Sequence, residues 1–173
     1  MKTVRKLSVL GIFAMFLTML ILPTARAAVQ LPAGMELKVE FIQDVSSKYV
    51  KPGDLAPIKL VEDIGVGGIT LVKAGAMGTA RVAKVEKAGK PGKPGSLELQ
   101  LVEIDSEGAY KTVDGAKIQL EATGGPIIAK GKSKKTMSYI FIFGLFIKGS
   151  DGVIPAGHVV TAKVKNDVMI VVD

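Results

Sequence analysis

Apolar and polar residues alternate along most of the chain after its first 30 positions. Leu37, Val39 and Phe41 alternate with charged or polar neighbours, and later segments repeat this two-residue period. Successive side chains of a strand point to opposite faces, so the period predicts strands with one face on a core and the other in water. The strands predicted from the sequence are 36–42, 78–86, 97–104, 116–122, 158–165 and 168–172, the last from a continuous apolar run rather than from alternation.

Turn-forming residues separate these segments, and no long 3.6-residue apolar period lies between them. Gly, Pro, Asp and Asn gather at 52–54, 65–68, 106–108, 114–115, 124–126, 149–152 and 166–167. Many short strands with such spacing predict an all-β fold, a small β-barrel or sandwich of short strands. The last segment, 168–172, is apolar throughout, which is typical of a buried strand.

A short pattern occurs three times. Pro32-Ala33-Gly34, Lys73-Ala74-Gly75 and Pro155-Ala156-Gly157 each follow an apolar residue. Five residues after each Gly comes a small apolar residue, then a charge, then another apolar residue. Gly accepts the positive φ that a tight turn needs, so the pattern predicts three comparable turns that each lead into a strand.

The first 27 residues have the features of an export signal. Lys2, Arg5 and Lys6 precede the uncharged run from Leu7 to Leu22, and Ala25-Arg26-Ala27 supplies a small-x-small cleavage site. The sequence therefore predicts a cleaved signal-peptide helix at 1–27, with 28–173 as a single β domain in the periplasm or at the outer membrane. The alternative is a signal retained as an anchor.

Composition narrows the range of functions. The chain has 173 residues and a net charge of +7, but the predicted signal carries four basic residues and no acid, which leaves +3. Nucleic-acid binding is therefore not expected. The absence of Cys excludes disulfides, thiol catalysis and Cys-ligated metals, and a single His excludes a histidine-rich metal site.

No catalytic set can be assembled from the remaining residues. His158, the only imidazole, follows the third turn and is expected in an exposed position. Glu103 and Asp105 are expected on the polar face of a strand. We therefore predict a protein that is not an enzyme, with no cofactor, no metal and no small-molecule substrate.

Two lysine-rich segments are candidate contact sites. Lys87, Lys90 and Lys93 stand three apart in a Gly- and Pro-rich stretch, 85–96, that is expected to form an exposed loop. The second segment holds Lys130, Lys132, Lys134 and Lys135. Each is either a contact with an anionic envelope polymer or lipid head groups, or a loop kept soluble by its charge.

An apolar segment, 137–147, follows the second cluster directly. It carries Tyr139, Phe141, Phe143 and Phe146, has no charge, and is too short to cross a membrane as a helix. One interpretation is a doubly buried core strand, or two strands hinged at Gly144. The other is an exposed hairpin or short helix that docks on a membrane or a partner, with Lys135 and Lys148 as flanking cations.

Several of these motifs together resemble a group of small exported bacterial envelope proteins. The residues are Leu31-Pro32-Ala33-Gly34, Ser46-Ser47-Lys48, Gly53-Asp54 and Ile154-Pro155-Ala156-Gly157. The group is in turn similar to the β-barrel domain of TrbI-type secretion scaffolds. The resemblance implies a barrel that forms rings in the outer membrane and binds neighbouring subunits rather than substrates.

Two functions remain open from the sequence. The first is an exported, non-enzymatic envelope protein that acts as a structural or interaction module. Its partner would be an envelope protein, the outer-membrane surface or another copy of the chain. The alternative is a periplasmic binding module for an anionic glycan or another envelope polymer.

Overall fold

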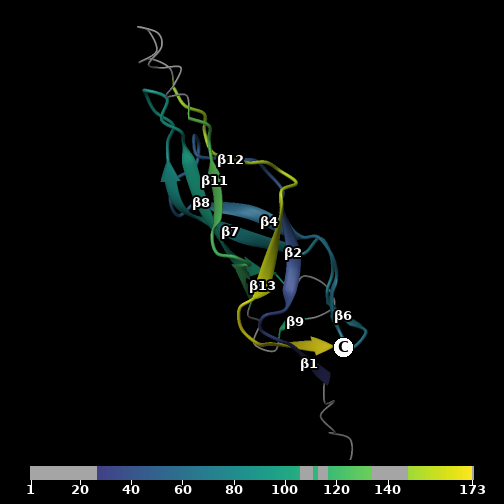
Figure 1. The fold of residues 1–173 in the computed structure, drawn as a ribbon. Coiled ribbons are helices and arrows are strands. Elements are labelled where there is room, and N and C mark those ends of the chain that lie inside the picture. Colours follow the sequence, from purple (N-terminus) through teal and green to yellow (C-terminus); the bar gives the residue numbers. More distant parts are fainter. Residues whose placement is uncertain (1–26, 106–110, 113–116, 134–147, 173) are drawn as a thin grey trace, which may run out of the picture.

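The computed structural model of the chain describes residues 27–105, 111–112, 117–133 and 148–172. In these ranges the backbone forms strands and turns and no helix, which confirms the all-β fold class. The described part is elongated (Figure 1). Its strands are β1 (Ala27–Leu31), β2 (Glu36–Phe41), β3 (Val45–Ser46), β4 (Leu55–Leu60), β5 (Ile64–Val66), β6 (Ile69–Val72), β7 (Met77–Glu86), β8 (Ser96–Ile104), β9 (Lys111–Thr112), β10 (Ile118–Ala122), β11 (Ile127–Lys130), β12 (Val153–Ile154), β13 (Val159–Val164) and β14 (Val168–Val172).

Six of these strands close into a barrel. Their order is β10-β13-β2-β4-β7-β8, and β8 returns to β10 through the pairs Ile118↔Ile104 and Gln119↔Glu103. All neighbours in the barrel are antiparallel. The first half of β8 pairs instead with β11, from Ile127↔Leu99 to Lys130↔Ser96. Closure removes free sheet edges, so the fold is the barrel and not the sandwich of the sequence-based prediction.

Alternate strand positions fill the barrel. On β2, Leu37, Val39 and Phe41 are buried, whereas the intervening Lys38 and Glu40 are more exposed. Phe41 is the largest fully buried side chain of the described residues. The same alternation occurs on β4, β8 and β10. The six strands predicted from the sequence are all present, with ends that differ by at most two residues.

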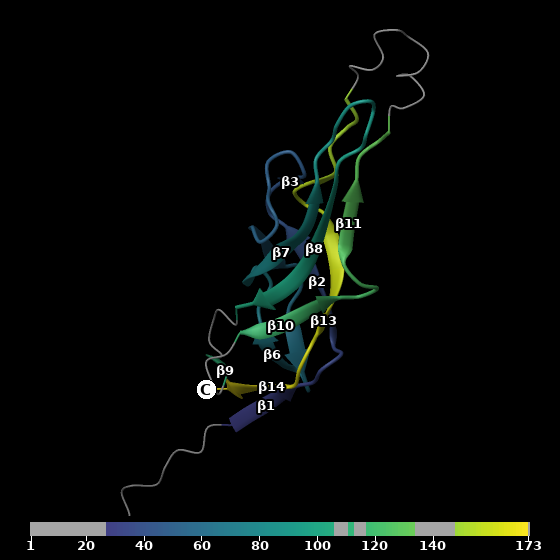
Figure 2. The same cartoon turned by 90° about the vertical axis from the view of Figure 1, so that its left-hand side faces the viewer.

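Three smaller sheets complete the described fold: β1-β14-β9, β3-β12 and β5-β6. β1 and β14 lie at the opposite end of the molecule from β3 and β11 (Figure 2). The run 168–172 is the predicted strand, but it is not buried along both faces as its apolar sequence indicated. Ile170 is buried while Met169 is 45% exposed, because only one face of this sheet packs against the core.

The three repeated turns share one geometry, as predicted. Gly34, Gly75 and Gly157 have φ of 81°, 89° and 79°. Each donates its N–H to a carbonyl of a strand in the barrel, at 2.8, 2.8 and 2.7 Å. Positive φ is the region that favours glycine, which explains why all three copies have Gly there.

An aspartate from elsewhere in the chain caps each of these turns. The Ala33 N–H donates to Asp167 Oδ1 at 2.7 Å, Ala74 N–H to Asp63 at 2.7 Å and Ala156 N–H to Asp44 at 2.8 Å. In each case the residue before the turn pairs with the residue after the aspartate: Leu31↔Val168, Val72↔Ile64 and Ile154↔Val45. The repeat is therefore a two-part unit that closes one end of a strand pair.

Replacing Asp63 with alanine should lower the free energy of unfolding by about 1–2 kcal/mol, since it removes a charged acceptor from the Ala74 N–H. Asp63→Asn keeps an acceptor oxygen and should lose about half as much. Glu62→Ala is the control: it breaks only an exposed pair with Lys38 at 3.4 Å, worth under about 1 kcal/mol. Chemical denaturation measures all three, and equal losses for Asp63→Ala and Glu62→Ala would contradict the role of the cap.

Candidate functional site

The loop between β7 and β8 carries the first lysine cluster. Gly89 and Lys93 exchange both backbone hydrogen bonds at 2.9 Å, which closes the tip of the loop. Lys87, Lys90 and Lys93 are exposed around it, whereas Ala88 is buried. The prediction of an exposed loop holds for the lysines, but the backbone is more ordered than the Gly- and Pro-rich sequence indicated, because neighbouring segments bond to it.

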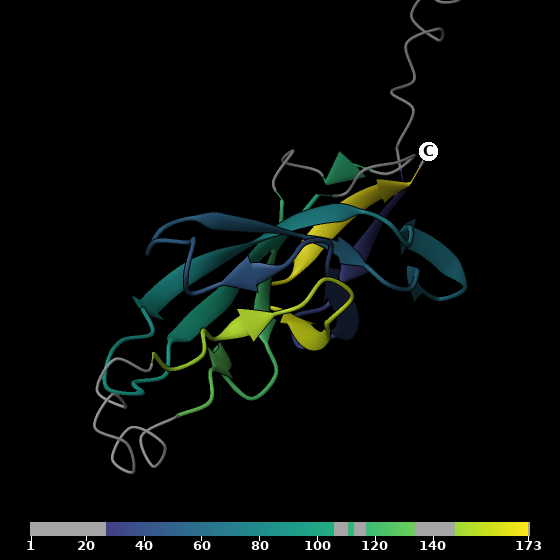
Figure 3. The same cartoon turned by 90° about the horizontal axis from the view of Figure 1, so that it is seen from above.

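Two further segments, 131–133 and 148–152, lie against this loop. The Ser133 hydroxyl donates to the Gly92 carbonyl at 3.3 Å, and the Gly149 N–H donates to the Gly89 carbonyl at 3.2 Å. The Ser150 N–H donates to the Lys132 carbonyl at 3.2 Å. All three segments meet at one end of the molecule (Figure 1; Figure 3). The fold thus joins two lysine clusters that are separate in the sequence.

Glycines allow this close approach. A Cβ at Gly152 would lie 2.5 Å from the Ala129 carbonyl oxygen, and a Cβ at Gly95 would lie 2.5 Å from Ser47 Oγ. Added Cβ atoms at Gly131 and Gly149 would collide with the backbone of Ser150 and Lys93. We call these four glycines and Ser47 the neck.

Ser47 is fully buried in the neck, and its bonds explain why a polar side chain is tolerated there. Its N–H donates to the Gly152 carbonyl at 2.9 Å, and its hydroxyl oxygen accepts the Gly152 N–H at 3.1 Å. Both groups of the residue are therefore paired with the segment that follows position 148.

The segments beyond and around the neck form a basic end, which we define as residues 84–96, 130–133 and 148–152. Two acids, Glu86 and Asp151, lie within it, so its net charge is +5. Glu86 lies 3.5 Å from Lys84 Nζ and 4.0 Å from Lys93 Nζ, and Asp151 lies 4.0 Å from Lys148 Nζ. The seven lysines are Lys84, Lys87, Lys90, Lys93, Lys130, Lys132 and Lys148.

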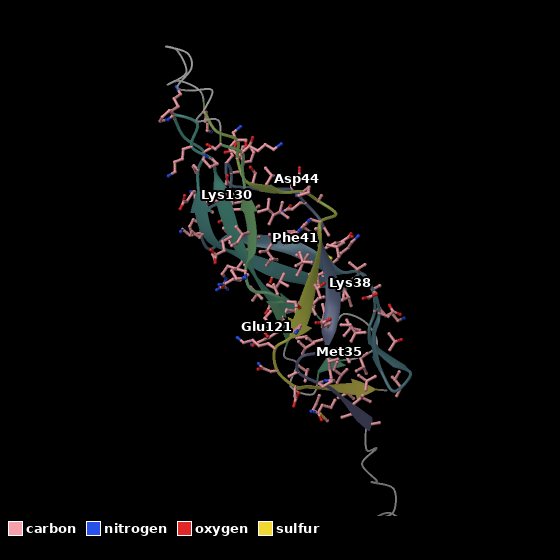
Figure 4. The ribbon with its side chains drawn as sticks, in the orientation of Figure 1. Met35, Lys38, Phe41, Asp44, Glu121 and Lys130 are labelled. Carbon is pink, nitrogen blue, oxygen red and sulfur yellow. The ribbon has the colours of Figure 1, made fainter. Side chains whose placement is uncertain are left out.

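The opposite end has the other sign. Residues 32–36, 61–76, 111–112 and 165–167 hold three lysines and four acids, a net charge of −1. Lys130 lies toward one end of the molecule and Met35 toward the other (Figure 4). Charge is therefore separated along the long axis, and such a distribution orients a protein in the field of a charged partner.

In the described part of the chain, the barrel wall has a cleft at β10 and a cleft near the basic end, and neither of these gathers a catalytic set. A cleft of about 270 Å³ lies where β10 leaves β8, above Leu101 and Leu120, with Glu121 and Lys165 among its polar lining. Another, of about 250 Å³, lies beside the basic end, where Lys84 and Lys130 alternate with Glu86 and Glu98. Both mix charges of either sign.

The other residues considered as candidates for chemistry take part in ring contacts and ion pairs. His158 is exposed, as predicted, and its ring centroid is 6.5 Å from that of Phe41. Within the described ranges, no group of three His, Cys, Asp or Glu residues could hold a metal ion. Glu103 and Asp105 both face Lys117, at 2.7 and 3.2 Å. Hydrogen bonds to Glu103 and then Asp105 raise the pKa of Lys117 above its usual value.

The structure brings together some of the predicted contact residues and not others. Lys87, Lys90 and Lys93 lie in the basic end. Sequence reasoning missed Lys84, because alternation places it on the same face as the buried Gly78, Ala80 and Val82. An irregularity in the pairing between Val82 and Lys84 turns it outward. The other candidates lie outside the described residues: Lys134, Lys135, Tyr139, Phe141, Phe143 and Phe146.

Comparisons with protein-family models and with curated proteins give no match. Among solved structures, the chain is similar to ComB10 of the Com type IV secretion system of Helicobacter pylori. The two share 14% identity over 81% of this chain and 90% of that one, with a TM-score of 0.44. At this identity and score the likeness assigns no function. In the described ranges, no helix is long and apolar enough to cross a membrane.

Proposed function

We propose that the chain is an exported, non-enzymatic envelope protein that acts as a structural or interaction module. Its contact region is the basic end together with the apolar segment 137–147. In this proposal residues 1–27 are the signal peptide, 28–173 form one β domain, and the protein works in the periplasm or at the outer membrane.

One observation carries this proposal. Ser133 and Lys148, the described residues on either side of 134–147, both belong to the basic end, where they lie beside the loop between β7 and β8. The chain therefore leaves from and returns to a cationic surface. The stretch between them contains Tyr139, Phe141, Phe143 and Phe146. Aromatic residues next to cations are typical of a protein or membrane contact.

The aspartate variant of Phe141 tests the proposal. If the ring serves a contact, Phe141→Asp should leave the melting temperature within about 2 °C of that of the unchanged protein, while envelope association falls at least about tenfold, because a charge is not tolerated in an apolar contact. Differential scanning fluorimetry and fractionation of cells that express the full-length chain give the two readouts.

Two variants control for unrelated effects. Phe141→Leu keeps an apolar side chain and should retain most of the association. Thr161→Asp adds the same charge on the exposed face of β13 and should change neither readout. A large loss of melting temperature in Phe141→Asp, with no separate loss of association, would place the ring in a core and overturn the proposal.

A further inference from the structure

We propose that the basic end binds anionic lipid head groups, so that the barrel stands end-on at a membrane surface. The proposal rests on the proposed function, since it names the partner of the same contact region.

The charge of the basic end is complementary to that of an anionic membrane surface. Seven lysines and two acids occupy the basic end, and the opposite end has a net charge of −1. A negatively charged surface attracts the first end and repels the second. The interaction therefore selects one orientation, with β3 and β11 toward the membrane and β1 and β14 away from it (Figure 2).

The shape of the basic end favours a surface over a linear polymer. A polymer is held along a groove, but the cleft at this end is lined by two lysines and two acids, so it has no net charge to hold an anionic strand. The loop lysines, in contrast, surround a tip at which three segments converge. A tip of this kind suits a plane of head groups.

The expected strength follows from the lysine count. One Lys near an anionic leaflet strengthens binding by about fivefold, so removing three positive charges should weaken it by about a hundredfold. Screening should weaken it as well, because the Debye length falls from about 10 Å at 0.1 M salt to about 3 Å at 1 M.

The test compares two triple variants of equal net charge. The first variant removes three exposed lysines from the basic end, by Lys87→Gln, Lys130→Gln and Lys132→Gln. The second removes three exposed lysines from other parts of the molecule, by Lys38→Gln, Lys73→Gln and Lys165→Gln. The processed protein, purified from cells that express the full-length chain, is sedimented with phosphatidylcholine vesicles that do or do not contain about 30% phosphatidylglycerol. Melting temperatures establish that both variants are folded.

We expect salt-sensitive binding to the anionic vesicles only, a loss of about a hundredfold in the first variant and a loss under about fivefold in the second. Equal losses in the two variants would mean that net charge alone acts and would overturn the proposal. Binding to soluble polyphosphate without binding to vesicles would identify a polymer partner and also overturn it. If no vesicle binds while Phe141→Asp still impairs envelope association, the proposed function stands and the lipid partner is wrong.

Discussion

Replacing Phe41 with alanine is expected to lower the free energy of unfolding by about 3–5 kcal/mol. Phe41 is the largest fully buried side chain of the described residues, on a β2 strand held between β13 and β4. Truncation removes the apolar surface of the ring and leaves a cavity that the closed barrel wall cannot fill by collapsing. Small domains are stable by about 5–15 kcal/mol, so the loss is a large share of the total.

The next residue provides the control. Ile42 follows Phe41 directly, one residue past the end of β2, and its side chain is 40% exposed. Ile42→Ala should therefore cost under about 1 kcal/mol. Urea denaturation of both variants measures the difference, and similar losses would mean that the Phe41 ring is no more important to the core than the half-exposed Ile42 side chain.

The strands that alternate cleanly could be predicted from the sequence, and β4 shows why others could not. Pro57 interrupts its pattern, and proline normally marks a strand as an edge or excludes it. In the structure Pro57 accepts a hydrogen bond from the Ile42 N–H at 3.4 Å, one residue past the end of β2. Pro57 has no N–H to donate, but β2, the neighbouring strand, has already ended opposite this position. A strand of the barrel wall therefore tolerates the proline.

The sequence predicted one part of each turn unit, the turn itself, but not the aspartate that caps it. The repeated Ala-Gly turns were recognised, but their aspartates lie 11, 112 and 134 positions away along the chain. A local signal was present: Asp44, Asp63 and Asp167 each stand directly before a Val or Ile that begins a strand. An Asp before an apolar strand is common enough that its partner could be found only from the strand pairing.

The two lysine clusters could each be named from the sequence, but their meeting could not. Alternation indicates which face of a strand is buried and says nothing about which strands are neighbours. The clusters come together because β11 pairs with the first half of β8 and places Gly131 against Gly95. That pairing also creates the neck, whose contribution can be measured separately from that of the lysines.

Replacing Gly152 with alanine is expected to lower the free energy of unfolding by about 2–3 kcal/mol, through overpacking. The added Cβ would lie 2.5 Å from the Ala129 carbonyl oxygen and 3.1 Å from that of Gly95. Both atoms belong to the backbone, so the segments must separate for the methyl group to fit. Separation weakens the two bonds between Gly152 and Ser47, whose hydroxyl then remains buried without its partner.

A second glycine of the same region is the matched control. At Gly89 an added Cβ would meet only the Lys93 side chain, at 3.8 Å, which is ordinary van der Waals contact. Gly89→Ala should change the stability by under about 0.5 kcal/mol. Hydrogen exchange provides the local readout, because the Gly95 and Gly131 N–H groups donate across the neck at 2.9 and 2.8 Å. These two amides should exchange faster in Gly152→Ala and unchanged in Gly89→Ala. If the two amides exchange at the unchanged rate in both variants, the hydrogen bonds across the neck survive the added Cβ at Gly152. The neck would then not be what holds the basic end to the barrel.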